Sequence, residues 1–596
     1  MRPLLLLAAA LAACAPSTPA APPTTWERQE LTIPMRDGVS LHAVALVPAG
    51  GHEPLPIILI RTPFGAANEF RSAELPARLQ ELGRDGYLFV TEDIRGRGQS
   101  EGTFVTMRPL ADSGGSDEST DAWDTIDWLV QHLPGNNGSV AVMGYSYRGW
   151  LAAMAGIHPH PALKAIVPEA PMTDIWLGDD FFHQGAFRQT QGVAYTAWFE
   201  GPGFEMPGDD EYAFYLKYPT LSALATATGV ADLPSWTGFR DHPARDGYWR
   251  ARALHEALTR PTVPTLVVGG LWDAEDLFGP QQLYQTLEPR DSASRTTLVL
   301  GPWVHGQWLR PRGDSIGPVP LGDATADRFR QEMLRPWLAH WLHGQGNGHF
   351  PEAQVFETGG QRWRRFDRWP PREAAPRRLY LQPAGGLGWE PPRTQAAVAL
   401  ATWTADPADP APFIPRPDAG QGWATWMLQD QRFLAGRRDV ASWVSAPLTE
   451  DVVIAGQVTA HLVASTSGTD ADWVVKLIDV YPDTLPDAPA LAGYQLMVSG
   501  DILRGRYWRG FETATPIPAA TPTPFTVDLH QQLYRFRKGH RLMVQVQSSW
   551  FPLYDRNPQR FVPNIFRATT ADFQAQEHRV WEGSYLEAGV DTVGGE

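Results

Sequence analysis

The sequence contains a single cysteine, Cys14, in 596 residues, so the folded body after it can have neither a disulfide bond nor a thiol nucleophile. It also lacks a run rich in Lys and Arg, and its formal net charge is −16. Nucleic-acid binding, which needs clustered cations, is therefore not expected. No spacing of His, Cys and Asp matches a zinc site, and we expect neither a metal nor another cofactor.

The N-terminus lacks an apolar run long enough to cross a membrane but is typical of an export signal. In MRPLLLLAAALAAC one Arg precedes a short apolar stretch, and the last four residues, ending at Cys14, resemble a bacterial lipobox. A plain secretory signal with a chance cysteine is the alternative. We expect residues 1–14 to be a lipoprotein signal and residues 15–27 a Pro/Ser/Thr-rich tether. The exported protein would then be anchored by lipid at Cys14, in the periplasm or at the outer membrane.

The part of the chain from residue 28 to residue 170 alternates short apolar runs with a helical pattern. LPIILIRTPFG, GYLFVTEDIRGRG, GSVAVMGYS and LKAIVPEAP are β-like, whereas DESTDAWDTIDWLVQHL has apolar residues at helical spacing. Two further β-like runs, TLVVGGLWD and TLVLGPWVH, occur in residues 256–347. This alternation predicts an α/β domain with a parallel sheet covered by helices on both faces.

Two other regions interrupt or follow this pattern. Residues 171–255 are rich in aromatic residues with helical patterning, which predicts a helical cap inserted over the carboxyl edge of the sheet. Residues 348–596 contain alternating runs such as DVVIAGQVTAHLVAS and RLMVQVQSS between Pro- and Gly-rich turns. We expect this region to be an all-β jelly-roll sandwich.

A candidate nucleophile lies at the end of one apolar run. The segment from Gly144 to Gly149 reads GYSYRG, a G-x-S-x-x-G pattern in which Ser146 follows a predicted strand and precedes a predicted helix. Such a turn exposes the serine hydroxyl at the tip of the strand. The alternative is an ordinary serine in a βα turn, because the spacing is not the commoner G-x-S-x-G.

Two later residues complete a candidate triad. Asp273 ends one predicted strand, and His305 follows the next. The order Ser, Asp, His, with each residue just after a strand, is the arrangement of α/β hydrolases. His305 would then accept the proton of Ser146, and Asp273 would orient the imidazole. A lone histidine is usually structural, but three roles in this order favour a catalytic site.

Several long motifs carry a family resemblance. GYSYRGW, PMTDIWLGDDFFHQGAFRQ, WDAEDLFG, GPWVHG and VQSSWFPLYDRNPQ resemble segments of the bacterial α-amino acid ester hydrolases, which are grouped with cocaine esterase and the Xaa-Pro dipeptidyl-peptidases. The resemblance extends from about residue 28 to near the C-terminus. It implies an α/β-hydrolase domain with a helical cap and a C-terminal jelly roll.

The resemblance also implies that three acids, Asp180, Glu275 and Asp276, bind the α-ammonium group of the substrate. A desolvated ammonium needs several anions or acceptors, and crowded carboxylates repel one another until a cation arrives. The alternative is a helix beginning at Asp273 as N-cap, with Glu275 and Asp276 in its first turn. That alternative leaves the second acid pair, Asp179 and Asp180, unexplained.

One position departs from the family pattern. The family has a tyrosine in RTPY, whose hydroxyl helps to form the oxyanion hole, whereas this chain has Phe64 in RTPF. The backbone N–H of Tyr147 is the other expected donor. Loss of one donor typically lowers turnover about 100- to 1,000-fold. Another donor replaces the hydroxyl, or the enzyme is slow on the family's substrates.

We therefore predict a serine hydrolase that cleaves, or transfers, acyl groups of α-amino acid esters or amides, including β-lactam side-chain types. The alternatives are an Xaa-Pro dipeptidyl-peptidase or a glutaryl-type cephalosporin acylase on the same triad, and a catalytically weak binding protein. The resemblance implies a homotetramer. The expected partners are the small-molecule substrate and the membrane lipid.

Overall fold

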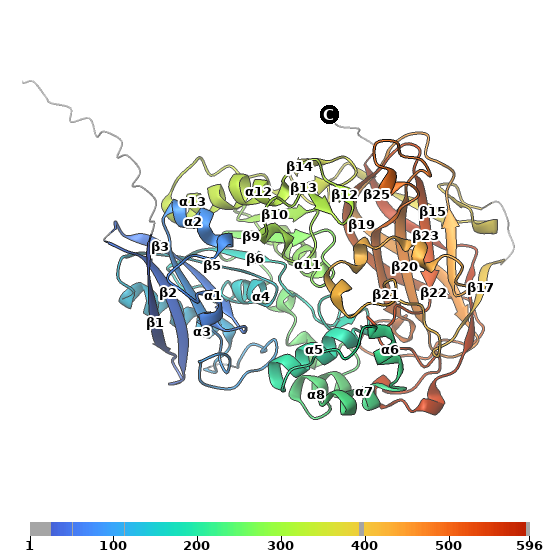
Figure 1. The fold of residues 1–596 in the computed structure, drawn as a ribbon, viewed down its shortest axis with the longest axis horizontal. Coiled ribbons are helices and arrows are strands. Elements are labelled where there is room, and N and C mark those ends of the chain that lie inside the picture. Colours follow the sequence, from blue (N-terminus) through green and yellow to red (C-terminus); the bar gives the residue numbers. More distant parts are fainter. Residues whose placement is uncertain (1–24, 51, 113, 393–397, 592–596) are drawn as a thin grey trace, which may run out of the picture.

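The computed structural model describes residues 25–591, apart from residues 51, 113 and 393–397. The predicted signal, Cys14 and all but the last residues of the predicted tether lie outside this range. Among the residues that are described, none of the helices has the length and apolar character needed to span a membrane. The chain forms an α/β domain and a β-sandwich, with a cap of short helices beside both (Figure 1).

The first domain is built on a ten-stranded sheet. Its strand order is β1-β2-β4-β3-β5-β6-β9-β10-β13-β14, and the pairs from β4 through β13 are parallel. The carboxyl ends of β5, β9 and β10 therefore meet at one edge. The strands are β1 Trp26–Pro34, β2 Ser40–Pro48, β3 Leu55–Thr62, β4 Leu88–Asp93, β5 Asn136–Tyr145, β6 Leu163–Glu169, β9 Thr265–Gly270, β10 Thr296–Gly301, β13 Ala353–Glu357 and β14 Arg362–Phe366.

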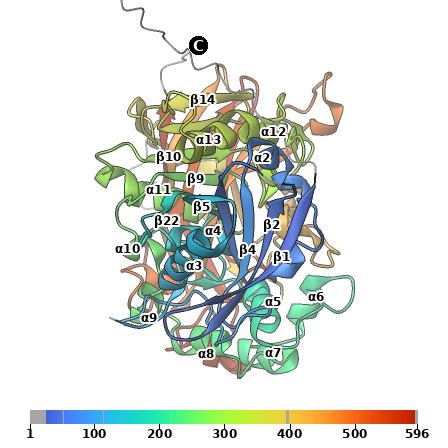
Figure 2. The same cartoon turned by 90° about the vertical axis from the view of Figure 1, so that its left-hand side faces the viewer.

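Alternate side chains of these strands bury themselves under helices on opposite faces. Leu59 packs with Ile126 of α3, whereas its neighbour Ile58 lies in the cluster with Leu82 of α2 and Leu338 of α13. The sheet thus separates α3 and α4 from α2 and α13 (Figure 2). The helices of this domain are α1 Ala66–Glu69, α2 Gln80–Asp85, α3 Glu118–His132, α4 Tyr147–Met154, α11 Phe278–Leu287, α12 Thr325–Arg328 and α13 Arg335–His343. The predicted α/β-hydrolase fold is confirmed.

The strand pairing differs from the predicted division at residue 348. β13 and β14 lie beyond that residue, yet β13 pairs in parallel with β10 and extends the first sheet. Both are five-residue strands in a region rich in turns, so the sequence does not distinguish them from the strands of the sandwich that follows. The first sheet consequently reaches to Phe366.

Helix α3 begins with a capping box at Asp117. The Asp117 carboxylate accepts the backbone N–H groups of Ser119 at 2.8 Å and Thr120 at 3.0 Å, and also that of Ala111 at 2.8 Å. Burial opposes its ionisation, but these hydrogen bonds outweigh that effect and lower the pKa of Asp117 below its usual value. The cap fixes the start of the helix that covers β5.

We expect Asp117→Ala to lower the free energy of unfolding by about 1–2 kcal/mol, because it leaves buried N–H groups without an acceptor. Urea denaturation followed by tryptophan fluorescence measures this. Asp117→Asn keeps an acceptor and should cost less than half as much. Equal losses in the two variants, or no loss in the alanine variant, would contradict the capping role.

The inserted cap lies at the side of the molecule where the two domains meet (Figure 1). It is mainly helical, as predicted, but it starts with a short hairpin between β7 and β8. Its aromatic residues form one cluster with those of the sandwich. The cap elements are β7 Phe182–His183, β8 Ala186–Phe187, α5 Gln189–Glu200, α6 Glu211–Leu216, α7 Leu221–Thr228, α8 Pro234–Asp241, α9 Gly247–Arg250 and α10 Leu254–Ala257.

The C-terminal domain is a sandwich of antiparallel sheets. One has the order β16-β15-β25-β19-β24-β17, with β22 paired to β19, and the other has the order β18-β23-β20-β21. The predicted jelly-roll class is confirmed. Its strands are β15 Ala374–Leu381, β16 Leu387–Gly388, β17 Ala399–Ala405, β18 Val440–Val444, β19 Val452–Thr466, β20 Asp472–Val480, β21 Gln495–Arg504, β22 Thr523–Phe536, β23 Arg541–Gln547, β24 Gln576–Trp581 and β25 Tyr585–Asp591.

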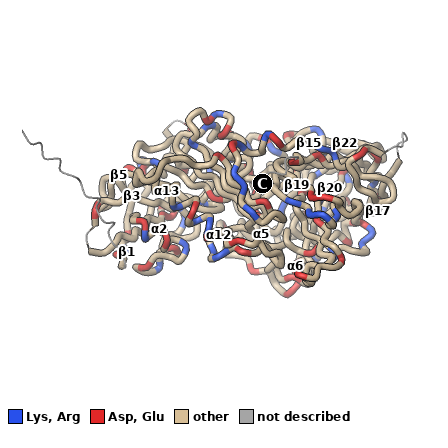
Figure 3. Tube along the Cα trace, turned by 90° about the horizontal axis from the view of Figure 1, so that it is seen from above, with Lys and Arg blue, Asp and Glu red and all other residues tan. Residues whose placement is uncertain are grey.

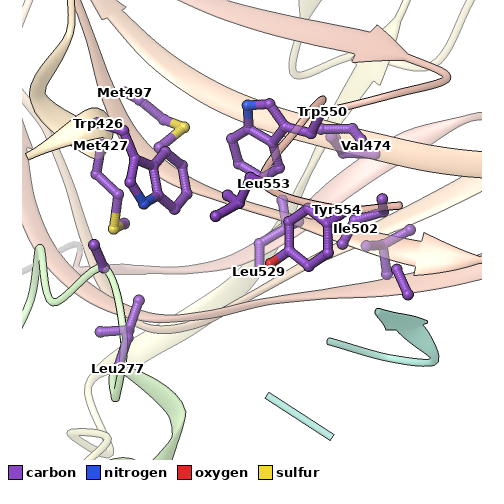
Figure 4. Packing of buried hydrophobic residues seen from close by; sticks show 14 of the residues in the cluster. Leu277, Trp426, Met427, Val474, Met497, Ile502, Leu529, Trp550, Leu553 and Tyr554 are labelled. Atoms are coloured by element: carbon purple, nitrogen blue, oxygen red, sulfur yellow. The ribbon is translucent and has the colours of Figure 1, made fainter. Parts of the chain in front are cut away.

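The sandwich holds the loop that joins β9 to α11. The indole N–H of Trp272 donates to the carbonyl oxygen of Met497 at 3.0 Å, and the Gln532 side chain donates to the carbonyl oxygen of Leu271 at 2.9 Å. At the other end of the loop, Leu277 is buried in the cluster that contains Trp426 (Figure 4). This loop, which carries Asp273, Glu275 and Asp276, is therefore fixed by both domains.

Acidic and basic residues are interspersed along both domains (Figure 3). Many form ion pairs between neighbouring elements, for example the fully buried Arg61 with Glu92, whose Nε and Oε1 atoms lie 2.6 Å apart.

Candidate active site

Ser146 lies in a tight turn between β5 and α4. Its backbone angles, φ 61° and ψ −130°, are strained for a residue other than glycine and expose the side chain at the tip of the strand. A Cβ on Gly144 would lie 2.5 Å from that of Arg148, and one on Gly149 would lie 2.3 Å from the carbonyl oxygen of Glu169. Ser146 itself thus makes the turn, whereas both glycines permit close packing around it.

His305 and Asp273 follow the adjacent strands β10 and β9, at the same edge of the sheet as Ser146. The Nδ1 atom of His305 lies 3.0 Å from each carboxylate oxygen of Asp273. Burial alone would raise the pKa of Asp273, but the His305 ring and two backbone N–H groups lower it below its usual value. The His305 ring packs beside Tyr145, the neighbour of Ser146, with ring centroids 5.8 Å apart. Asp273 and His305 are therefore in direct contact, and Ser146 is the sequence neighbour of a residue that packs on the His305 ring.

Asp273 also organises the turn that follows it. One of its carboxylate oxygens accepts the backbone N–H groups of Glu275 and Asp276, each at 3.0 Å. Helix α11 begins only at Phe278, and its N-cap residue, Leu277, makes no side-chain cap. Glu275 and Asp276 therefore precede the helix, and helix capping does not account for their presence.

The three predicted acids Asp180, Glu275 and Asp276 gather beside the triad and are all at most 3% exposed. Both carboxylate oxygens of Asp276, and one of Asp180, find no hydrogen-bond partner within the described part of the chain. Burial, followed by repulsion from neighbouring acids, raises the pKa of Asp180 and of Asp276 well above the usual value. The cluster is thus a buried site with unsatisfied carboxyl groups.

The adjacent Asp179 serves a different purpose. Its Oδ2 atom accepts the backbone N–H groups of Thr173 at 2.6 Å and Asp174 at 2.8 Å, which braces the first loop of the cap. The acid pair identified in the sequence therefore divides into a structural Asp179 and a cluster member, Asp180.

Two cap residues that the sequence reasoning missed support the cluster. The hydroxyl of Tyr195 donates to Oε1 of Glu275 at 2.6 Å. The fully buried guanidinium of Arg188 donates to the carbonyl oxygen of Ala274 at 3.0 Å and to that of Glu275 at 3.4 Å. An arginine and a tyrosine inside an aromatic-rich segment were the available signals, but nothing in the spacing related them to Glu275.

Tyr147 and Phe64 occupy the two expected oxyanion-hole positions. Tyr147 is the first residue of α4, so its N–H has no acceptor within the helix and lies next to Ser146. Phe64 and Ser146 line the same small cavity. The Phe64 ring packs against those of Trp198 and Phe199, each at 5.7 Å between centroids, and its own N–H donates to the Thr62 hydroxyl.

A larger cavity of about 350 Å³ lies next to the cluster. Glu275 and Tyr195 form part of its wall, and the partly exposed indoles of Trp198 and Trp423 lie at its surface. Its lining combines the cap helix α5 with a sandwich loop. An apolar group attached to a bound ammonium would find space here.

Two family models together match most of the chain. One, described as X-Pro dipeptidyl-peptidase (S15 family), matches residues 37–307, and the other, its C-terminal non-catalytic domain, matches residues 347–585. A solved α-amino acid ester hydrolase is 41% identical, covers 97% of this chain and 98% of its own, and superposes with a TM-score of 0.92. The chain belongs to the S15 family of serine hydrolases.

Two further proteins are similar to this chain over most of its length. An aminopeptidase from a marine sediment archaeon, Thaumarchaeota archaeon, is 40% identical over 98% of this chain and 99% of its own, with a TM-score of 0.91. Cocaine esterase from Rhodococcus sp. (strain MB1 Bresler) is 29% identical over 88% of this chain and 91% of its own length. This S15 member is accordingly a serine hydrolase with ester-hydrolase relatives.

A further buried group in this S15 hydrolase links the cap to the sandwich. Asp501 accepts from Nδ1 of His183 at 3.0 Å and from Nε2 of His530 at 2.7 Å. The three ligand-type atoms lie close enough to hold a cation, but the two hydrogen bonds already satisfy the carboxylate. We assign no metal here, and the expectation of a metal-free enzyme stays a prediction.

Proposed function

We propose that this serine hydrolase cleaves esters or amides of α-amino acids whose amino group is free, through an acyl-enzyme. The observation that carries the proposal is the buried cluster of Asp180, Glu275 and Asp276 beside Ser146 and His305, in which Asp180 and Asp276 have oxygens without a donor among the described residues. An ammonium group supplies both the positive charge and the donors that such a cluster lacks.

The proposed mechanism uses the residues in their family roles. Ser146 attacks the acyl carbon while Nε2 of His305 takes its proton, and Asp273 orients the imidazolium that forms. The N–H of Tyr147 stabilises the oxyanion. His305 then protonates the leaving group, and water resolves the acyl-enzyme; an amine acceptor such as a β-lactam nucleus would give acyl transfer instead.

The position of the cluster favours single amino acids as the acyl group. An Oε2 atom of Glu275 lies 3.3 Å from Nε2 of His305, the atom that serves the scissile bond. In an α-amino acyl group only the α-carbon separates the ammonium from the acyl carbon. In an Xaa-Pro dipeptide the N-terminus is one residue, roughly 3.5 Å, farther away. A glutaryl group would bring a carboxylate to three others, which disfavours a glutaryl acylase.

The proposal is tested by comparing phenylglycine methyl ester with its N-acetylated form. Acetylation removes the ammonium charge and leaves the buried carboxylates unpaired, so we expect kcat/KM to fall about 10- to 100-fold. Alanyl-proline p-nitroanilide should be cleaved more slowly than the free amino ester. Equal rates on the two phenylglycine esters would refute recognition of the ammonium group.

The catalytically weak binding protein is distinguished by a covalent probe. A fluorophosphonate should label Ser146 in the folded enzyme, and failure to label would favour binding over catalysis. Export with lipid attachment at Cys14, periplasmic or outer-membrane location and assembly into a homotetramer remain part of the proposal. Metabolic labelling with a palmitate analogue and sedimentation of the lipid-free protein test them.

A further inference from the structure

The imidazole of His305 faces a carboxylate at each of its two nitrogens. Nδ1 lies 3.0 Å from Asp273, and Nε2 lies 3.3 Å from Oε2 of Glu275. The other oxygen of Glu275 accepts the hydroxyl of Tyr195, as described above. Glu275 therefore lies beside Nε2, the nitrogen that receives the proton of Ser146 in the proposed mechanism.

This geometry favours the protonated ring. Nδ1 is hydrogen-bonded to Asp273, and Nε2 lies at ion-pair distance, 3.3 Å, from Glu275, so a positive charge on the imidazole faces a carboxylate on each side. Burial alone would lower the pKa of His305, but Asp273 and Glu275 raise it to about 9. The groups that face the ring or its partners from the surrounding elements are Asp273, Glu275 and Asp276 of the β9–α11 loop, Asp180, Arg188 and Tyr195 of the cap, and the rings of Tyr145 and Trp423.

We propose that Glu275 holds His305 in its protonated, unreactive form until the ammonium group of the substrate takes over the Glu275 carboxylate and releases the base. The substrate's amine is then a condition for catalysis as well as a binding determinant. This inference rests on the proposed function, because it requires the ammonium to bind in the cluster.

The proton balance of the cycle is simple. When the ammonium binds, its N–H groups satisfy Glu275, its charge disfavours the nearby imidazolium, and the Nε2 proton leaves to solvent. Nε2 then accepts the Ser146 proton as the Oγ–carbon bond forms. The same proton passes to the leaving group as the scissile bond breaks.

The proposal predicts how the hydrolysis rate depends on pH. Without an ammonium, the base becomes available only as the pH rises toward about 9, so His305 is mostly protonated at pH 7. A bound ammonium lowers the pKa of His305. The acid limb of the pH–rate profile should therefore shift to lower pH. An ester without the amine, such as methyl phenylacetate, has no titrating group of its own, and its profile reports the enzyme alone.

The decisive experiment measures kcat/KM for methyl phenylacetate from pH 6 to pH 9 in the wild type and in Glu275→Gln. Removing the negative charge next to Nε2 should lower the midpoint of the acid limb and raise kcat/KM at pH 7 about tenfold, which corresponds to one pKa unit. The same variant should be slower than wild type on phenylglycine methyl ester. An unchanged midpoint on methyl phenylacetate would overturn the inference.

Glu53→Gln is the matched control, because it makes the same chemical change at an exposed glutamate that precedes β3, outside the site. It should change kcat/KM for either ester at pH 7 less than threefold. A gain on methyl phenylacetate as large as that of Glu275→Gln would show that overall charge matters and the Glu275 contact does not. Circular dichroism checks that both variants are folded.

A test in the wild type avoids any folding question. Methylammonium chloride should speed the labelling of Ser146 by a neutral fluorophosphonate at pH 7, because the small cation frees the base. Potassium chloride at the same ionic strength should not. A rate unchanged or lowered by saturating methylammonium would contradict the inference.

The two proposals fail in different ways. Equal wild-type rates on phenylglycine methyl ester and methyl phenylacetate would remove the proposed function. A wild type that prefers the amine, together with a Glu275→Gln variant whose midpoint on methyl phenylacetate is unchanged, would remove only the present inference.

Discussion

Ser146→Ala is expected to lower kcat on an amino acid ester by about 10⁴- to 10⁶-fold, the range found when a serine nucleophile is removed from a triad. The variant removes the serine hydroxyl from the strained turn between β5 and α4, so His305 would have no serine proton to accept. Steady-state kinetics on phenylglycine methyl ester measures the loss, with enzyme concentration high enough to detect the residual rate.

Ser139→Ala is a suitable control for that variant. Ser139 lies near the other end of the same strand, β5, so the change alters the strand without touching the site. It should retain wild-type turnover. More than a tenth of wild-type activity in Ser146→Ala, or fluorophosphonate labelling at another residue, would assign the nucleophile elsewhere.

Phe64→Tyr is expected to raise kcat about 100-fold on the same ester. The Phe64 ring lines the small cavity that contains Ser146, and a hydroxyl on it would supply the oxyanion donor that the family pattern has and this chain lacks. One such donor is typically worth about 100- to 1,000-fold in turnover. The effect should appear in kcat rather than in KM, because the donor acts on the transition state.

The matched control for this second variant is Phe104→Tyr. Phe104 belongs to the same group of aromatic rings, 5.5 Å from Phe199 between centroids, but is not among the residues that line the cavity at Ser146. It should change kcat less than threefold. No gain in Phe64→Tyr would mean that another group already completes the oxyanion hole.

The sequence predicted those features that depend on order along the chain. Strands that end in Ser146, Asp273 and His305 must meet at one edge of a parallel sheet, so their proximity followed from the alternation of elements. The extension of that sheet by β13 was not predictable, because a five-residue strand is too short to reveal which sheet it joins. Register and pairing depend on tertiary packing.

The parts of the site that the sequence did not predict all involve the cap. The contact of Tyr195 with Glu275 joins residues 80 positions apart, and it exists only because α5 folds back over the sheet edge. The contact of Glu275 with Nε2 of His305 similarly depends on side-chain directions that no motif specifies. The family pattern predicted the three acids, but it did not show which of them contacts His305.

The contacts between the sandwich and the β9–α11 loop matter for engineering of substrate selectivity. Trp272 and Leu277 tie both flanks of the acidic segment to the β-domain, so that domain helps to set substrate choice. Exchanging sandwiches between relatives should alter selectivity for amines even when every catalytic residue is retained. To transfer the specificity to another enzyme, the β9–α11 loop would have to be moved together with the part of the β-domain that contacts it.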